Sequence, residues 1–184
     1  MEFVAFLKSL LPLISRKMPE RKVRMPHKLR GRTFDEYSID DEIVSGTRTV
    51  TEADVVNFAN LSGDFQPEHM NEEFARKGPI GARVAHGLLV LSIATGLLNQ
   101  KGPFEGTSIA ILEVTARFAK AVKFGDTIRA IQKIVGKKET SKPDRGVLTT
   151  HITVLNQDDQ TILEADLVIL LYRRGFVPDR MSQI

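Results

Sequence analysis

Hydrophobic residues recur at helical spacing in the first half of the chain. The apolar positions between residues 3 and 14 follow the 3.6-residue period of an amphipathic helix, which Pro12 is expected to kink or end. Residues 51–62 show the same period, with Thr51 as the N-cap and Asp54 as the third residue of an imperfect capping box. The pattern therefore predicts one helix near the N-terminus and a second that begins after Thr51.

The segments around the second helix have other signatures. Ile43–Val50 is predicted as a strand, and Gly63 is expected to end the helix that follows it. A short helix is expected at Asn71–Arg76, with Asn71 as its cap. Leu88–Leu98 is apolar almost all round, which is typical of a helix buried on every side.

Four further strands are predicted in the second half of the chain, where Ile, Val, Thr and Leu are enriched and turn signals separate the runs. They are Ile109–Val122, Thr127–Lys138, Gly146–Leu155 and Thr161–Arg173. Connections this short require antiparallel pairing. The sequence therefore predicts an α+β domain with one buried helix and a sheet that wraps it.

The charges divide the chain into two parts. Residues 1–33 hold nine basic and two acidic residues, a net charge of +7, whereas residues 34–184 have a net charge of −4, which leaves +3 for the whole chain. This distribution excludes a globally basic nucleic-acid-binding domain, so no nucleic-acid partner is expected. We expect residues 1–33 to be a basic amphipathic extension and linker, and residues 34–184 to be the folded domain.

The sequence of the extension leaves its function open. It lacks the design of a signal peptide, because Glu2 precedes the apolar run and Lys8 interrupts it. Three interpretations remain: residues 3–14 dock on the domain or on a partner subunit, they bind an anionic membrane surface, or they form a poorly ordered extension.

The amino-acid composition excludes several kinds of functional site. The 184 residues, 42% hydrophobic and 27% charged, suffice for one ordinary domain. The absence of cysteine removes disulfides, thiolate metal sites and cysteine nucleophiles; it fits a reducing compartment, and a cytoplasmic location is expected. The four histidines lack metal-site spacing, so no metal is expected. No apolar run reaches the roughly 18–20 residues of a membrane-spanning helix.

One stretch concentrates polar reactive groups between apolar helices. Asp64 and His69 lie five residues apart across a turn that contains Pro67, where a carboxylate and an imidazole could hold a water between two proton-transfer groups. Gly87 begins the buried helix, and its free N–H suits a carbonyl oxygen that gains negative charge. From spacing alone, Asp64 could instead cap a helix or form a turn, and His86 could cap or pack.

The same stretch carries a resemblance to a known family. The run Leu61–His69 (LSGDFQPEH), followed by Ala85–Leu89 (AHGLL), resembles the MaoC-like family of (R)-specific enoyl-CoA hydratases and dehydratases. The resemblance covers roughly residues 43–172 and implies the hot-dog fold, a long central helix wrapped by an antiparallel sheet of about five strands. It implies that Asp64 and His69 are the catalytic pair and that the Gly87 amide is the oxyanion donor. Gln66 and His86 are candidate supporting residues. At the position of Gln66, family members often carry Asn.

The activity implied by the resemblance is reversible addition of water to trans-2-enoyl thioesters of CoA or acyl carrier protein, which gives (3R)-3-hydroxyacyl thioesters. No cofactor is expected, since the thioester carrier is part of the substrate. A homodimer or a higher homo-oligomer is implied by the resemblance, because the site of this fold normally lies against a subunit interface. Arg83, Lys120 and Lys123 are candidates for binding the 3′-phosphate of CoA, and the alternative for each is an ordinary surface charge. A hot-dog acyl-CoA thioesterase and a non-catalytic acyl-CoA-binding subunit are the alternatives.

Overall fold

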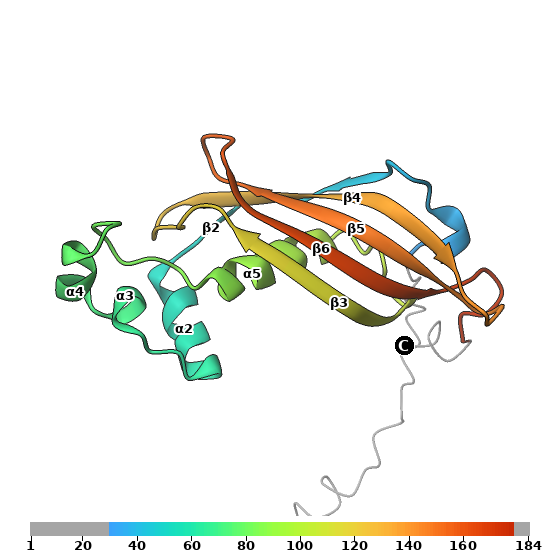
Figure 1. Cartoon of the computed structure of the whole chain (residues 1–184), viewed down its shortest axis with the longest axis horizontal. Helices are drawn as coiled ribbons and strands as arrows, with labels where there is room; N and C mark the ends of the chain where they lie inside the picture. Colours follow the sequence, from blue (N-terminus) through green and yellow to red (C-terminus); the bar gives the residue numbers. More distant parts are fainter. Residues whose placement is uncertain (1–29, 179–184) are drawn as a thin grey trace, which may run out of the picture.

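A long helix, α5 (Gly87–Asn99), packs across one face of an antiparallel β-sheet, as Figure 1 shows. The computed structural model describes residues 30–178. Six strands form the sheet in the order β1-β4-β5-β6-β3, with β2 also paired to β4. Their bounds are β1 Glu42–Val44, β2 Arg48–Thr49, β3 Ser108–Phe118, β4 Thr127–Glu139, β5 Arg145–Leu155 and β6 Thr161–Tyr172. A long helix wrapped by such a sheet is the hot-dog architecture, so the predicted α+β fold class is confirmed.

Alternating burial along the central strands builds the core. β4 and β5 turn every second side chain inward, and Ile134, Leu148 and Ile152 are fully buried. α5 contributes Ile93 and Ala94 to the same hydrophobic core. Burial of an aliphatic side chain of this size stabilises the fold by about 1.5–3 kcal/mol. This shared layer therefore holds α5 in place against the sheet.

Two of the predicted strands are shorter than their sequence pattern. The predicted strand Ile43–Val50 is divided into β1 and β2, because the hydroxyl of Ser45 accepts a hydrogen bond from Ala130 N–H at 2.8 Å, where a strand would offer a main-chain acceptor. β3 stops four residues before Val122, whose carbonyl instead accepts a hydrogen bond from Ala85 N–H at 2.8 Å. Both changes come from contacts between distant segments.

Three shorter helices lie beside the N-terminal end of α5, beyond the sheet (Figure 1). They are α2 (Glu52–Ser62), α3 (Pro67–Met70) and α4 (Glu72–Lys77), and a 3-10 turn, η1, covers Phe34–Glu36. The predicted N-cap of α2 is confirmed, because the Thr51 hydroxyl accepts from Asp54 N–H at 3.3 Å and the Asp54 carboxylate accepts from Thr51 N–H at 2.9 Å. α2 ends at Gly63, which has φ of +79°, a left-handed conformation that glycine adopts easily. Asn71 caps α4 as predicted.

α5 is not buried on every side, so that prediction is wrong. Its inner face is buried, but Leu88 is 61% exposed, and Ser92 and Gly96 are exposed beside it. The sheet covers only part of the helix, because β3 is its edge strand. β3 exposes further apolar side chains, among them Ile111 and Leu112. An apolar strip on α5 and β3 is therefore left uncovered by the described residues.

The predictions for residues 3–14 lie outside the described residues. At the end of the predicted linker, Arg30 forms an ion pair with Glu105 at 2.7 Å, and Arg32 N–H donates to the carbonyl of Pro103 at 3.0 Å. These contacts join the start of the described chain to the loop after α5. Within residues 30–178, no helix is both long enough and apolar enough to cross a membrane.

Candidate active site

The end of α2 and the start of α3 enclose the loop that carries Asp64. The backbone N–H of Asp64 donates to the hydroxyl of Ser62 at 3.2 Å, and its carboxylate accepts from Gln66 N–H at 3.3 Å. Pro67 then occupies the first turn of α3, where its missing N–H leaves no hydrogen bond unmade. The sequence pattern predicts a loop here, whereas Pro67 both ends the loop and begins the short helix that carries His69.

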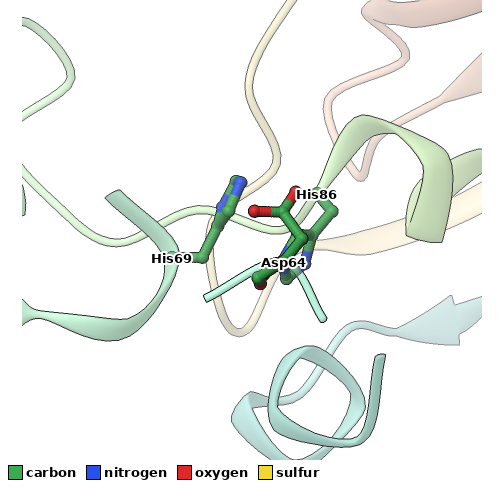
Figure 2. Close-up of side chains that lie close together, drawn as sticks. All are labelled: Asp64, His69 and His86. Atoms are coloured by element: carbon green, nitrogen blue, oxygen red, sulfur yellow. The ribbon is translucent and has the colours of Figure 1, made fainter. Parts of the chain in front are cut away.

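Three reactive side chains gather at the start of α5. Figure 2 shows Asp64, His69 and His86 close together. One carboxylate oxygen of Asp64 and one ring nitrogen of each histidine lie within 4.8 Å of one another. The loop brings Asp64, α3 brings His69, and the residue before α5 brings His86. The fold therefore places the two residues predicted as a pair at one point and adds a second imidazole.

A main-chain carbonyl fixes the orientation of His69. Its Nδ1 lies 2.8 Å from the carbonyl oxygen of Val84. Because a carbonyl oxygen can only accept a hydrogen bond, Nδ1 carries the proton and Nε2 of the neutral ring keeps its lone pair. His69 therefore has a nitrogen that can accept a proton in a group that also contains a carboxylate.

His86 is buried behind this pair. Its side chain does not cap α5; instead, its Nε2–H donates to the backbone carbonyl of Asp64 at 3.0 Å. The ring packs against His69, with 3.8 Å between ring centroids, and against Phe58 at 5.0 Å. The residue is 3% exposed, and its Nδ1 has no hydrogen-bond partner among the described residues. His86 thus contacts both members of the pair from the core side.

The backbone of Gln66 makes hydrogen bonds to both Asp64 and His69. Its N–H donates to the Asp64 carboxylate, and its carbonyl accepts from His69 N–H at 3.0 Å. Its side chain, by contrast, makes no hydrogen bond to residues 30–178. The supporting contacts of Gln66 are therefore main-chain contacts.

Gly87 presents an amide at the first position of α5, where a backbone N–H has no acceptor within the helix. The ring of Phe118 lies over this glycine: a Cβ atom there would meet Phe118 Cδ1 at 2.7 Å. Only glycine fits under the ring as it stands. The positive end of the α5 dipole adds to the amide, which suits an oxygen that gains negative charge.

Two hollows follow each other along the face of α5 that points to β3. The first, about 360 Å³, is lined by Gly87, Leu88 and Phe118, among other residues. The second, about 540 Å³, is lined by helix residues one to three turns further on and by side chains of β3 and β6. A ligand group held at the Gly87 amide could therefore continue along the helix into the second hollow.

The basic residues near the site are not equivalent. Arg83 forms ion pairs with Glu52 at 2.6 Å and Glu72 at 3.0 Å. The hydrogen bonds that Arg83 donates to these two carboxylates, that to Glu52 first, raise the pKa of its guanidinium. Two carboxylates already pair with its charge, so Arg83 is a weaker candidate for a phosphate than a lysine that has no such partner among the described residues. Lys120, in contrast, lines the hollow beside Gly87.

The donor set of Asp64, His69 and His86 is also chemically able to hold a metal ion. In both rings, one nitrogen already donates to a backbone carbonyl, which leaves one lone pair each. A carboxylate and lone pairs are equally suited to the hydrogen atoms of a water molecule. The expectation of a metal-free site therefore stays a prediction.

Sequence reasoning missed three residues that contact the site: Phe118 lies over Gly87, Val84 bonds to His69, and Phe58 packs on His86. Phe118 has the alternating pattern of a strand residue, and Phe58 has the pattern of a helix core residue. Val84 contributes only its carbonyl oxygen, which any residue would supply. None of the three therefore carries a signal that separates it from ordinary structural residues.

Comparison with known proteins places this geometry in a family. A family model described as MaoC like domain matches residues 36–156, more than half of the chain. Protein MaoC of Klebsiella aerogenes is 38% identical over 112 residues, which make up 61% of this chain and 32% of that protein. The chain thus spans about a third of the length of that relative. (R)-specific enoyl-CoA hydratase of Rhodospirillum rubrum is 26% identical over 136 residues, which make up 74% of this chain and 90% of that enzyme.

A solved structure shows the same arrangement of elements. The monoamine oxidase regulatory protein from Archaeoglobus superposes with a TM-score of 0.74 at 35% sequence identity. The match covers 79% of this chain and 97% of the other. The likeness therefore extends over almost the whole of the other chain.

Proposed function

The chain belongs to the MaoC-like domain family, and from that premise we propose that it adds water reversibly to trans-2-enoyl thioesters, giving (3R)-3-hydroxyacyl thioesters. The observation that carries the proposal is the grouping of Asp64 and His69 next to the Gly87 amide. The relative from Rhodospirillum rubrum, named an (R)-specific enoyl-CoA hydratase, supports both the reaction and its stereochemistry.

The Gly87 amide polarises the substrate. When the thioester carbonyl accepts a hydrogen bond from this N–H, electrons shift toward its oxygen and C3 becomes electrophilic. The helix dipole stabilises the enolate that forms when water adds to C3. Loss of one oxyanion donor typically raises the barrier by about 3–4 kcal/mol.

Asp64 and His69 carry out the proton transfers of the reaction. A water held between the carboxylate and His69 Nε2 gives up one proton to the pair as its oxygen bonds to C3. C2 of the enolate then receives one proton, so the overall addition is balanced. The two residues act as one unit, and the proposal assigns the proton transfers to the pair. No metal or cofactor takes part in these steps, so prolonged dialysis against EDTA is expected to leave the activity unchanged.

The substrate extends in two directions from the amide. We assign the acyl chain to the hollow along α5, because apolar side chains of the helix and of β3 line it. The carrier, CoA or acyl carrier protein, lies toward solvent, where Lys120 is the candidate for contact with its phosphate groups.

A second copy of the chain is the proposed cover of the apolar strip on α5 and β3. Leu88, Ile111 and Leu112 are each more than half exposed. One edge of β3 pairs with no strand of residues 30–178, and proteins usually protect such an edge. A homodimer would cover both features and close the hollows along α5 from outside.

A pair of spectrophotometric assays tests the proposal. Hydration of crotonyl-CoA is followed by the loss of enoyl absorbance, and release of free thiol is followed in parallel. Asp64→Asn and His69→Gln are expected to lower kcat by about 10²–10⁴-fold, the range of proton-transfer catalysis. The matched control Asp166→Asn changes a carboxylate of β6 that pairs with His151 on the sheet, and it is expected to keep activity within about twofold of the original chain.

Three results would overturn the proposal. Hydration within a few-fold of the original chain in Asp64→Asn would remove the role of the carboxylate. Thiol release without hydration would identify a thioesterase. Binding of acyl-CoA with neither reaction would identify a non-catalytic subunit.

A further inference from the structure

Among the described polar side chains that line the hollow along α5, only that of Gln132 is buried. Gln132 of β4 points inward between apolar neighbours and is 3% exposed, and it lines the hollow of about 540 Å³ together with Leu91, Ile152 and Leu167. Inward positions of a sheet are normally apolar, and a buried amide is stable only where its donors and acceptors are satisfied. The hydrogen bonds of Gln132 therefore decide what the hollow can accept.

A short chain of hydrogen bonds orients the amide. Gln132 Nε2 donates to the hydroxyl of Thr150 at 2.9 Å, and that hydroxyl donates to the carbonyl of Leu167 at 3.5 Å. A hydroxyl has one hydrogen, so the Thr150 oxygen acts as acceptor toward Gln132. The carbonyl oxygen of the amide, Oε1, is the remaining group, and it accepts no hydrogen bond from residues 30–178.

The other polar side chains of the wall differ from Gln132 in burial or in bonding. Asn99 and Ser108 are not buried, and Arg30 pairs with Glu105 at 2.7 Å. The hydroxyl of Ser92 donates to the carbonyl of Leu88 at 2.8 Å, and that of Thr95 donates to the carbonyl of Ser92 at 3.0 Å. Both are bonds within α5. Gln132 Oε1 thus differs from these neighbours: it is an acceptor on a buried side chain, and no donor of residues 30–178 bonds to it.

An unpaired acceptor in such a place discriminates between ligands. An apolar chain that displaced water from Oε1 would leave the acceptor unsatisfied, which weakens the binding of that chain. A chain with a hydroxyl at the same place would restore the bond. Sites built to bond a hydroxyl reject analogues that lack it much more strongly than apolar pockets reject an added methylene.

We propose that the acyl chain of the substrate carries a hydroxyl group on its distal part, and that this hydroxyl donates a hydrogen bond to Gln132 Oε1. The proposal rests on the proposed function, because the thioester is placed at Gly87. Helix residues that line the hollow, from Leu91 to Asn99, lie four to twelve positions beyond Gly87, or about 6–18 Å at 1.5 Å per residue. The hydroxyl is therefore remote from the carbons that react.

The test compares matched thioesters. Trans-2-enoyl-CoAs of increasing chain length, each with and without a terminal hydroxyl, are assayed with the original chain, with Gln132→Met and with Leu91→Met. Methionine keeps the length of glutamine without its acceptor, and Leu91→Met changes the same wall without removing a polar group. At one chain length or more, we expect the original chain and Leu91→Met to show at least a tenfold higher kcat/KM for the hydroxylated substrate, and Gln132→Met to lose that preference.

A binding measurement separates failure of this inference from failure of the proposed function. Saturated acyl-CoAs with and without a terminal hydroxyl are titrated calorimetrically into the same three proteins. A tenfold preference for the hydroxylated ligand that disappears in Gln132→Met supports the inference even if no enoyl-CoA is turned over, a result that would overturn the proposed function alone. Equal binding and equal turnover of both ligand types at every length, or an unchanged preference in Gln132→Met, would overturn the inference.

Discussion

The Nε2–H of His86 donates a hydrogen bond to the backbone carbonyl of Asp64 at 3.0 Å, which ties the start of α5 to the loop that carries the carboxylate. The same ring packs on His69. His86 is therefore a positioning residue in our proposal: it touches both members of the pair and stays buried itself.

Two amide substitutions separate positioning from packing at His86. The nitrogen of Gln occupies nearly the place of Nε2 in His, whereas the nitrogen of Asn occupies nearly the place of Nδ1. We expect His86→Gln to keep kcat within a few-fold and His86→Asn to lower it at least tenfold with little change in KM, because small displacements of reacting groups are costly. Steady-state kinetics with crotonyl-CoA measure the difference. Equal kcat values in the two variants would contradict the role.

Gly87→Ala tests whether the close contact between Gly87 and the ring of Phe118 positions the backbone amide. The added Cβ would meet Phe118 Cδ1 at 2.7 Å, so the ring or the helix start must shift. We expect kcat to fall about 10–100-fold, since the amide donor moves away from the substrate oxygen. In the double variant with Phe118→Ala, space is restored and part of the loss is expected to be recovered. Losses that simply add on the free-energy scale would show that the two residues do not interact.

A charge on β3 tests the proposed homodimer. Leu112 is 55% exposed on the edge strand, and Leu112→Lys would place an ammonium in the proposed interface. We expect light scattering to show a dimer for the original chain and a monomer for this variant. Val135→Lys is the matched control, because Val135 is 46% exposed on β4, away from that edge, and it is expected to leave the dimer intact. If light scattering showed that the original chain is a monomer, the proposed homodimer would be wrong.

Asp35 makes the stability of the fold depend on acid pH. Its carboxylate accepts hydrogen bonds from Arg173 Nη2 at 2.7 Å and from Arg174 N–H at 2.8 Å. The bond from the Arg173 side chain, followed by that from the Arg174 backbone, holds the pKa of Asp35 below its ordinary value. Because the folded pKa is the lower one, this stabilisation is present above the unfolded pKa of about 3.9 and is lost as the pH falls through the folded pKa.

Asp35→Asn is therefore expected to lower the free energy of unfolding at neutral pH by about 1–2 kcal/mol. The difference from the original chain should shrink as the pH falls through the folded pKa of Asp35, because the carboxyl of the original chain then takes up a proton. Urea unfolding in a series of buffers from neutral to acid pH measures it. Asp158→Asn, in the exposed turn between β5 and β6, is the control and should change little at any pH of the series. A difference that stays constant with pH would contradict the assignment.

Local interactions explain why much of the fold could be predicted. The capping box of Thr51 and Asp54 is formed within four residues of chain, so its sequence pattern is sufficient. The strands β4 and β5 alternate strictly because one face of each meets α5, and that alternation is visible in the sequence. The spacing of Asp64 and His69 across Pro67 likewise gave the grouping that the structure shows.

Contacts between distant segments explain what could not be predicted. An apolar helix such as α5 looks the same in sequence whether the sheet or another chain covers it, so its exposed face at Leu88 could not be foreseen. Gln132 is one glutamine among the residues of a strand, and its partner Thr150 belongs to the next strand. The ring of Phe118 reaches Gly87 only because β3 ends beside the start of α5.

Both imidazoles of the site are held by carbonyl oxygens, those of Val84 and Asp64. Every amino acid supplies such an oxygen, so replacing the side chain of Val84 leaves the anchor of His69 available. Deleting or inserting a single residue between Met70 and Val84, in contrast, would carry that oxygen away from the ring. The segment is therefore expected to tolerate changes of identity and to be intolerant of changes of length.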